Sequence, residues 1–334
     1  MSTTRVRREL PELPLTGWEE TKNTLHLWAQ IVGKVRMAST APRNHWWHAT
    51  LYVDVRGLTT RRMPARGGVA FEIDFDFVEH RLVVATNRGE VESFDLADGL
   101  SVAAFDEKLH ATLAALGIDV AIREHPYRVP MTTAFPEDQE HASYDRDAVE
   151  RFWHVLEWTG EVLEEFAGWY CGKTSPVHVF WHSFDLALTR FGGERAPALP
   201  DANPVDEETY SHEVISFGFW AGDANVREPT YYSYTAPEPA GLRQQPLHPD
   251  EASWTEYGNG SLALLPYDAV RSAPDPRAAL LAFLESAYRA GAGLSGWDQA
   301  TLESSWCPSP PELSNLLAGL APTAQVGRPR AGEL

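Results

Sequence analysis

The sequence predicts an α+β protein of two similar halves, each with a roughly four-stranded antiparallel sheet flanked by helices. The first observation is an internal echo: the segment NHWWHATLYVDVRGLT, residues 44–59, returns more faintly as HVFWHSFDLALTRF, residues 178–191. The second is that each copy follows a stretch with apolar residues at helical spacing and precedes one with two-residue alternation. We therefore expect an internal duplication in which the two sheets enclose a central pocket.

Composition and the positions of loop-forming residues divide the chain into five expected segments. Proline-rich stretches without periodicity mark the connector and the loose ends. The segments are a flexible N-terminus at 1–12, a first α+β unit at 13–117, a connector at 118–145, a second α+β unit at 146–305 and a flexible tail at 306–334.

In the first unit, residues 17–37 carry apolar residues every three or four positions, which predicts an amphipathic helix that begins with a capping box. Residues 47–56 predict the first strand, and FEIDFDF at 71–77 alternates strictly between apolar and acidic residues. Residues 81–86 and 90–96 flank a turn and predict a hairpin, after which a second helix follows with Ser101 as its cap.

The second unit is expected to repeat this order. Asp147 and Glu150 stand at capping spacing before a helix to about Tyr170, and the second copy of the strand follows. Later strands are separated by long loops, and Asp275 followed by proline predicts the start of a last helix.

The charge of the chain restricts its partners. Forty-seven acidic and 28 basic residues among 334 give a formal net charge of −19. Such a field repels phosphate backbones and anionic lipid surfaces, so we expect neither nucleic acid nor a membrane as a partner. No apolar stretch approaches the roughly 18 residues of a membrane span, and no apolar signal region follows the basic N-terminus. We expect a cytoplasmic protein without a nucleotide cofactor, since phosphate-loop and dinucleotide motifs are missing.

One face of the first predicted sheet is polar. It carries His48, Tyr52, Asp54, Arg56, Glu72, Asp74 and Asp76. As the wall of a cavity, this face could support general acid and base chemistry. The alternative is the solvated face that antiparallel sheets ordinarily have, and it is the stronger interpretation for Asp74 and Asp76.

Histidines gather around both copies of the echoed segment. A histidine with a carboxylate is typical of an iron, manganese or zinc site, which makes a divalent metal the candidate cofactor. The candidate ligands are His45, His48, His178, His212 and Glu213. His45 and His48 would face opposite sides of a strand, so such a site needs ligands from several strands. The alternative is histidines hydrogen-bonded inside an aromatic core.

A polar stripe of His26, Gln30 and Lys34 lies along the first predicted helix, one turn apart each. A solvated helix face is the ordinary explanation. Because the stripe lacks acidic residues in a very acidic chain, contact with an anionic ligand is the alternative.

Seven motifs are spread along the chain: TLHLWAQIVGKVR (24–36), NHWWH, GLTT, FEIDFDF, HASYD (141–145), SPVHVFWHSFDLALTRF and SHEVISFGFW. Together they resemble an uncharacterised bacterial family of unknown function, of the DUF5996 type, from about Leu13 to about Leu302. The resemblance implies no particular activity. It directs attention to the residues within the motifs, which are His26, Gln30, His45, His48, His141, His178, Asp185, Arg190, His212 and Glu213.

These observations favour an enzyme that acts on a small organic molecule, by acid-base or divalent-metal chemistry, in a pocket lined by histidines and aromatic residues. The catalytic candidates are His48, His178, His212, Glu213, His26 and Arg190. The candidates for substrate binding are Trp47, Tyr52, Gln30, Lys34, Trp181 and Asp185. The alternative is a non-catalytic module that binds a small ligand or another protein through the long loops at 194–209 and 237–260.

Overall fold

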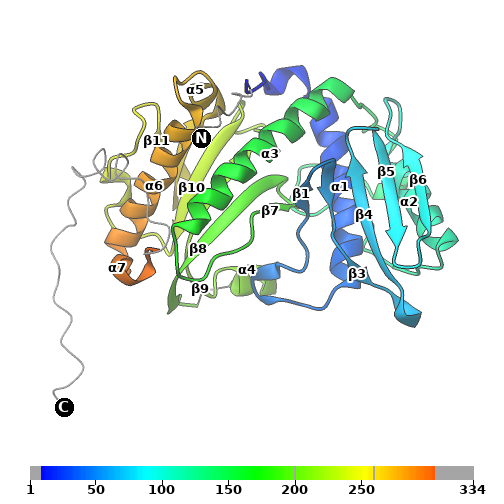
Figure 1. Cartoon of the computed structure of the whole chain (residues 1–334), viewed down its shortest axis with the longest axis horizontal. Coiled ribbons are helices and arrows are strands. Elements are labelled where there is room, and N and C mark those ends of the chain that lie inside the picture. Colours follow the sequence, from blue (N-terminus) through cyan, green and yellow to red (C-terminus); the bar gives the residue numbers. More distant parts are fainter. Residues whose placement is uncertain (1–8, 199–200, 259, 305–334) are drawn as a thin grey trace, which may run out of the picture.

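A computed structural model describes residues 9–198, 201–258 and 260–304 of the protein (Figure 1). The first unit and the connector contain η1 (Leu15–Gly17), α1 (Glu19–Ser39), η2 (Asn44–Trp46), β1 (Tyr52–Asp54), β2 (Gly57–Thr59), β3 (Met63–Pro64), η3 (Arg66–Gly68), β4 (Ala70–Asp76), β5 (Arg81–Thr86), β6 (Val91–Asp95), α2 (Val102–Ala115) and η4 (Phe135–Glu137). The second unit contains α3 (Arg146–Gly168), β7 (His178–Phe180), β8 (Asp185–Arg195), α4 (Pro204–Thr209), β9 (His212–Trp220), β10 (Thr230–Ala236), η5 (Leu242–Gln244), β11 (Ser253–Tyr257), β12 (Gly260–Pro266), α5 (Tyr267–Arg271), α6 (Pro276–Leu294) and α7 (Gln299–Leu302).

Each unit contributes one antiparallel sheet, which confirms the α+β class, but each sheet has six strands where about four were predicted. The first has the order β1-β2-β4-β5-β6, with β3 also paired to β4, and the second has the order β11-β12-β10-β9-β8-β7. The edge strands β1 and β7 meet at Leu51 and Val179, where each backbone N–H donates to the other residue's carbonyl oxygen, at 2.9 and 2.8 Å. The sheets are therefore joined edge to edge, an arrangement that does not enclose a pocket between two facing sheets.

Aromatic side chains pack the helices against their sheets. In the first unit, Trp28 of α1 stacks on Phe105 of α2 at 4.9 Å, and Phe105 stacks on Phe75 of β4 at 6.1 Å. In the second unit, Phe166 of α3 packs edge-on against Phe217 of β9 at 5.0 Å. In Figure 1, α3 and α6 lie in front of the second sheet, whereas α1 and α2 lie behind the first.

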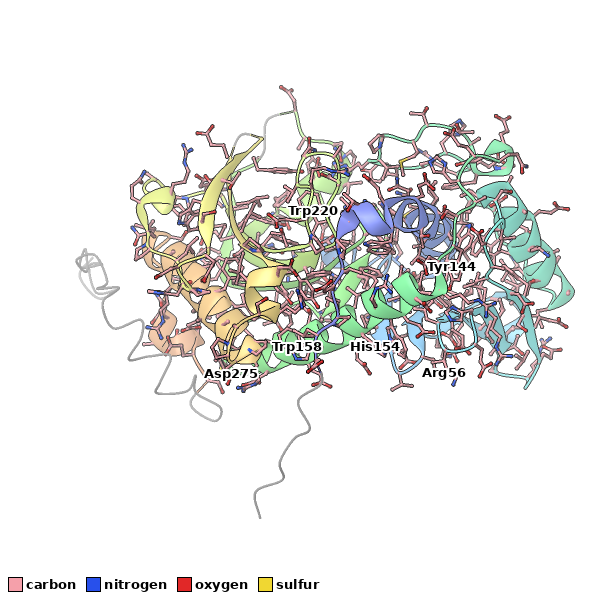
Figure 2. The ribbon with its side chains drawn as sticks, turned by 90° about the horizontal axis from the view of Figure 1, so that it is seen from above. Arg56, Tyr144, His154, Trp158, Trp220 and Asp275 are labelled. Carbon is pink, nitrogen blue, oxygen red and sulfur yellow. The ribbon has the colours of Figure 1, made fainter. Side chains whose placement is uncertain are left out.

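The helix α3 spans both units. Figure 2 shows it running from near Tyr144 past His154 and Trp158 toward Asp275 at the start of α6. In the first half of α3, the indole N–H of Trp153 donates to the carbonyl oxygen of Asp54 in β1, at 3.1 Å. The contacts along α3 therefore stabilise the junction of the two sheets in addition to the Leu51 and Val179 pair.

The predicted first strand is wrong at its beginning. Residues 44–48 form a turn, and β1 starts only at Tyr52. His45 and Trp46 have φ angles of 54° and 60°, which a continuous strand excludes. In the second copy, Trp181 lies in a turn after β7 instead of inside a strand. Both Trp-His pairs thus lie in turns that precede a strand, which is β1 in the first copy and β8 in the second.

Other local predictions are confirmed, with shifted helix starts. The strand β4 and the β5–β6 hairpin lie where alternation and the turn predicted them. Ser101 and Asp275 cap their helices, each accepting the N–H three residues further on at 3.1 Å. The cap of α3 is Asp145 instead of Asp147, and Trp18 precedes α1 without a side-chain cap in place of the predicted capping box.

The predicted tail at 306–334 and residues 1–8 of the predicted N-terminal segment lie outside the described residues. Within the described part of the chain, no helix is long and apolar enough to cross a membrane.

Gly33 in α1 is required by the close approach of the turn after β7. A Cβ at this position would lie 2.2 Å from the indole of Trp181, so Gly33→Ala is expected to lower the free energy of unfolding by about 2 kcal/mol or more. Gly160 in α3 is the matched control, because its Cβ would meet nothing within 4 Å. Gly160→Ala is expected to raise stability by about 0.5–1 kcal/mol through helix propensity. Urea unfolding of both variants measures this, and equal effects would contradict the packing.

Candidate functional site

The turn at residues 44–48 carries backbone strain. His45 and Trp46 both occupy the left-handed region, which costs a non-glycine residue roughly 1–2 kcal/mol. The turn is held by α4, since the backbone N–H of His45 donates to Oε1 of Glu208 at 2.9 Å. Strain of this kind is concentrated at functional sites, which favours the surroundings of the turn as the candidate site.

Alternate side chains of the turn lie on two sides. His45 and Trp47 pack against Phe191 of β8, with ring centroids 4.6 and 5.8 Å away. Trp46 instead stacks on His48, at 5.3 Å. The turn therefore separates two groups of polar residues, one beside His45 and one beside His48.

On the first side, both ring nitrogens of His45 are engaged. Nδ1 lies 3.2 Å from the carbonyl oxygen of Glu208, and Nε2 lies 2.7 Å from Nζ of Lys173. Because a carbonyl only accepts and an ammonium only donates, the proton is on Nδ1 and the ring is neutral. Burial, followed by the charge of Lys173, lowers the pKa of His45. Lys173 lies 4.4 Å from the ring centroid of Phe191, and its partial desolvation lowers its own pKa.

An open groove of about 420 Å³ lies beside this contact. Its lining consists of Asn44, His45, Arg195, Pro204, Glu207, Glu208, Ser211 and His212. His212 of β9 pairs across the sheet with Arg195 of β8, and directly opposite residues have Cβ atoms about 5 Å apart. The Ser211 hydroxyl donates to the carbonyl of Glu208 at 2.9 Å, so Nδ1 of His212, 3.1 Å away, donates to the Ser211 oxygen. In the neutral ring, Nε2 of His212 then remains as a proton acceptor.

The groove brings together two of the five predicted metal ligands. The rings of His45 and His212 are 5.7 Å apart. Glu213 faces the other side of β9, where its Oε2 accepts from the indole N–H of Trp297 at 2.9 Å. His48 lies across the turn. Among the residues that the structure describes, no three His, Cys, Asp or Glu are grouped so that they could hold a metal ion. The predicted ligand set is therefore not assembled.

On the second side of the turn, Arg36 lies near both His48 and His178. The register of Leu51 and Val179 places His178 next to Tyr52, and the guanidiniums of Arg36 and Arg61 lie 5.5 and 3.5 Å from the Tyr52 ring. His178 is fully buried, and neither ring nitrogen has a hydrogen-bond partner. Burial, then the charges of Arg36 and Arg61, lower the pKa of His178 to about 3.

The stripe of His26, Gln30 and Lys34 is buried, which corrects the solvated face expected for it. Its polar atoms bind backbone. His26 donates to the carbonyl of Trp181 at 3.0 Å, and Gln30 bonds both the N–H and the carbonyl of Tyr127, at 2.8 and 3.0 Å. Lys34 donates to a carbonyl of the connector at 2.8 Å. Burial lowers the pKa of His26 to about 3 and that of Lys34 to about 8. The stripe fastens the connector and the turn after β7 to α1.

Three further predicted site residues lie away from the groove. Arg190 is buried on the helix side of β8, with its guanidinium 3.5 Å from the Phe166 ring centroid, and burial lowers its pKa to about 10. Asp185 accepts hydrogen bonds from the hydroxyls of Ser183 and Tyr232. Trp181 packs against α1. Each of these positions has a structural partner within the fold.

The acidic face of β4 does not line the groove either. Asp76 pairs with Arg56 at 2.8 Å, and hydrogen bonds from Arg56 and two backbone N–H groups keep its pKa below the usual value although burial acts against them. Asp74 is half-buried, and burial raises its pKa to about 6.

Sequence reasoning missed the residues that hold the groove together. Lys173, Arg195 and Glu208 belong to no catalytic motif, and Lys173 meets His45 across 128 positions of the chain. The one signal was the length of the loop at 194–209, since long loops often carry functional residues. Part of that loop is the short helix α4, which provides Glu208.

The fold and the groove together define an α+β protein with two edge-joined antiparallel sheets and a polar groove at a strained turn. The chain belongs to the family of unknown function DUF5996, whose family model matches residues 10–304. This match confirms the resemblance expected from the motifs. No characterised protein and no solved structure matched the chain.

The contact of Lys173 with His45 can be tested by titration. Removing the ammonium in Lys173→Met is expected to raise the pKa of His45, because the Lys173 charge helps to lower it. NMR of ring-labelled histidines measures the midpoint. Lys108→Met removes the same charge from an exposed position of α2 and is expected to leave the titration midpoint of His45 unchanged. A His45 midpoint that also stays in place in Lys173→Met would show that the two groups do not interact.

The neutral state of His178 predicts a dependence of stability on pH. Its pKa is depressed in the folded state, so the unfolded chain binds the extra proton between about pH 6.5 and pH 3, and stability falls as the pH falls through that window. Between pH 7 and pH 5 this one group is expected to cost about 2 kcal/mol. Asp74, with its raised pKa, acts in the opposite direction below about pH 6.

Replacing His178 by Phe isolates the contribution of His178 to the pH dependence of stability. Asp74 and His26 are common to both proteins, so their contributions cancel in the comparison. Urea unfolding at pH 7 and pH 5 is expected to show about 2 kcal/mol less loss of stability in His178→Phe than in the wild type. The same loss in both proteins would mean that His178 is not buried in its neutral form.

Proposed function

We propose that the protein is a cytoplasmic enzyme that transfers a proton to or from a small anionic organic molecule bound in the groove. The observation that carries this proposal is the pairing of His212 with Arg195 across β8 and β9, at the wall of the groove. A guanidinium binds a carboxylate through two parallel N–H donors, and an imidazole nitrogen beside it can remove or return a proton.

His212 is the general base in this proposal. Its Nδ1–H is oriented by the Ser211 oxygen, which leaves Nε2 with a free lone pair. A substrate whose carboxylate contacts Arg195 would present the adjacent carbon or hydroxyl to that nitrogen. Of the predicted catalytic residues, His212 alone lines the groove, whereas His48, His178, Glu213, His26 and Arg190 do not.

Lys173 and His45 are positioning residues. Lys173 occupies Nε2 of His45, and His45 through Nδ1 and its backbone N–H fixes Glu208 at the end of α4. Glu208 in turn accepts from Ser211, the residue that orients His212. A chain of hydrogen bonds thus runs from Lys173 to the proposed base.

A second function, binding without catalysis, is favoured by one specific feature. Both nitrogens of His45 are taken, so His212 is the single imidazole of the groove with a free nitrogen. A binding module needs shape and a few hydrogen bonds only, and the groove offers both.

Hydrogen exchange of the substrate separates the two functions. We expect that, among small hydroxy, keto and amino acids incubated with the protein in ²H₂O, at least one exchanges a C–H for deuterium, as followed by ¹H NMR. His212→Asn keeps a side chain that can hydrogen-bond but removes the base, and it is expected to lower the rate at least about 100-fold.

His154→Asn on α3, outside the groove lining, is the matched control and is expected to keep the full rate. Exchange at an unchanged rate in His212→Asn would rule out this base. Compounds that bind without any exchange would favour the binding module.

We also infer that the two units descend from one duplicated unit. Support comes from the common order of elements, because each unit has a long helix, an antiparallel sheet and a later helix, as α1 with α2 and α3 with α6. Aligning the two halves across the family tests this inference, and apolar positions that fail to coincide would contradict it.

A further inference from the structure

Five cationic or potentially cationic side chains gather on the His48 side of the turn, and together we call them the arginine cluster. They are Arg36, Arg43, Arg61, His48 and His178. Arg36 and Arg61 flank the same ring, that of Tyr52, at 5.5 and 3.5 Å. The backbone N–H of Arg43 donates to Nδ1 of His48 at 3.1 Å, which leaves the proton of this ring on Nε2.

The cluster has no acidic partner. Among the described residues, no carboxylate forms an ion pair with Arg36, Arg43 or Arg61. Burial lowers the pKa of Arg36, a hydrogen bond to Tyr52 acts against this, and the charges of Arg61 and Arg43 lower the pKa further. In a chain with a formal net charge of −19, three neighbouring arginines without a carboxylate are a local exception.

The cluster also has more hydrogen-bond donors than acceptors. Arg36 is 7% exposed and donates to the carbonyl of Thr60, yet its Nε–H has no partner. His178 is 0% exposed with both ring nitrogens unpartnered, and one of them carries the N–H of the neutral ring. The indole N–H of Trp46, stacked on His48, is likewise buried without an acceptor. Buried donors without acceptors are costly, so the missing component here is an acceptor.

We propose that the arginine cluster is a binding site for a small oxyanion, either a phosphate group or a carboxylate. An oxyanion supplies the negative charge and the hydrogen-bond acceptors that the site lacks. Guanidiniums match the geometry of such oxygens with paired donors. The exposed side chains of Arg43 and Arg61 form the outer part of the site, and the buried Arg36 and His178 form its inner part. This inference is independent of the function proposed for the groove.

Anion binding can be measured by titration calorimetry and by thermal unfolding at constant ionic strength, with chloride as the balancing anion. We expect inorganic phosphate or acetate to raise the melting temperature of the wild type and to give a measurable Kd. Arg61→Gln removes one outer guanidinium from an exposed position and is expected to weaken binding at least about tenfold.

The control variant is Arg88→Gln, which removes an equal charge from the exposed turn between β5 and β6 and is expected to bind as the wild type does. His178→Phe, which keeps the ring shape and removes the nitrogens, is expected to weaken binding as well. Stabilisation by phosphate alone identifies a phosphate site, and stabilisation by acetate alone identifies a carboxylate site. No response to either anion, or equal responses in Arg61→Gln and Arg88→Gln, would overturn the proposal.

Discussion

The pair of backbone hydrogen bonds between Leu51 and Val179 determines how the rest of the molecule is arranged. Both residues are fully buried, and their bonds join β1 and β7, edge strands of three residues each. Strands this short add little stability by themselves, so each edge depends on the other and on α3 across them. The same register brings Tyr52 beside His178 and brings the turn at residues 44–48 against β8. The groove and the arginine cluster both follow from this one junction.

The strained turn persists because contacts on both of its sides fix it. Glu208 holds the backbone N–H of His45, Lys173 holds its ring, and the Thr40 hydroxyl donates to the carbonyl of His48 at 2.8 Å. Each such hydrogen bond contributes about 1 kcal/mol net, and together they are comparable with the cost of the left-handed conformation of two residues. The turn is thus determined by partners from the end of α1, from α4 and from the segment before β7, and it can position side chains on both of its sides.

The sequence was informative wherever structure depends on local periodicity. The alternation of β4, the helix α1 and the caps Ser101 and Asp275 were predictable because neighbouring residues decide them. The turn at 44–48 was not, because contacts far along the chain stabilise its positive φ angles. For the site, residue type pointed to His212 and His45, since histidine suits proton transfer. The contact of His45 with Lys173 could not be predicted from the sequence, because no spacing rule connects residues 128 positions apart.

Charge and burial together explain why the two sides of the turn differ in character. Ionic screening limits a surface charge to roughly 8–10 Å, so the acidic surface does not neutralise cations that the fold has buried and left unpaired. On the His48 side, His178 stays neutral because its pKa is near 3, and the positive charge therefore resides on arginines, which remain charged at all physiological pH values. On the His45 side, the carbonyl of Glu208 at the end of α4 fixes the proton of His45, and the Ser211 oxygen fixes the proton of His212. The first arrangement suits the constant attraction of an anion, and the second suits the movement of a proton, so a single turn separates two different kinds of chemistry.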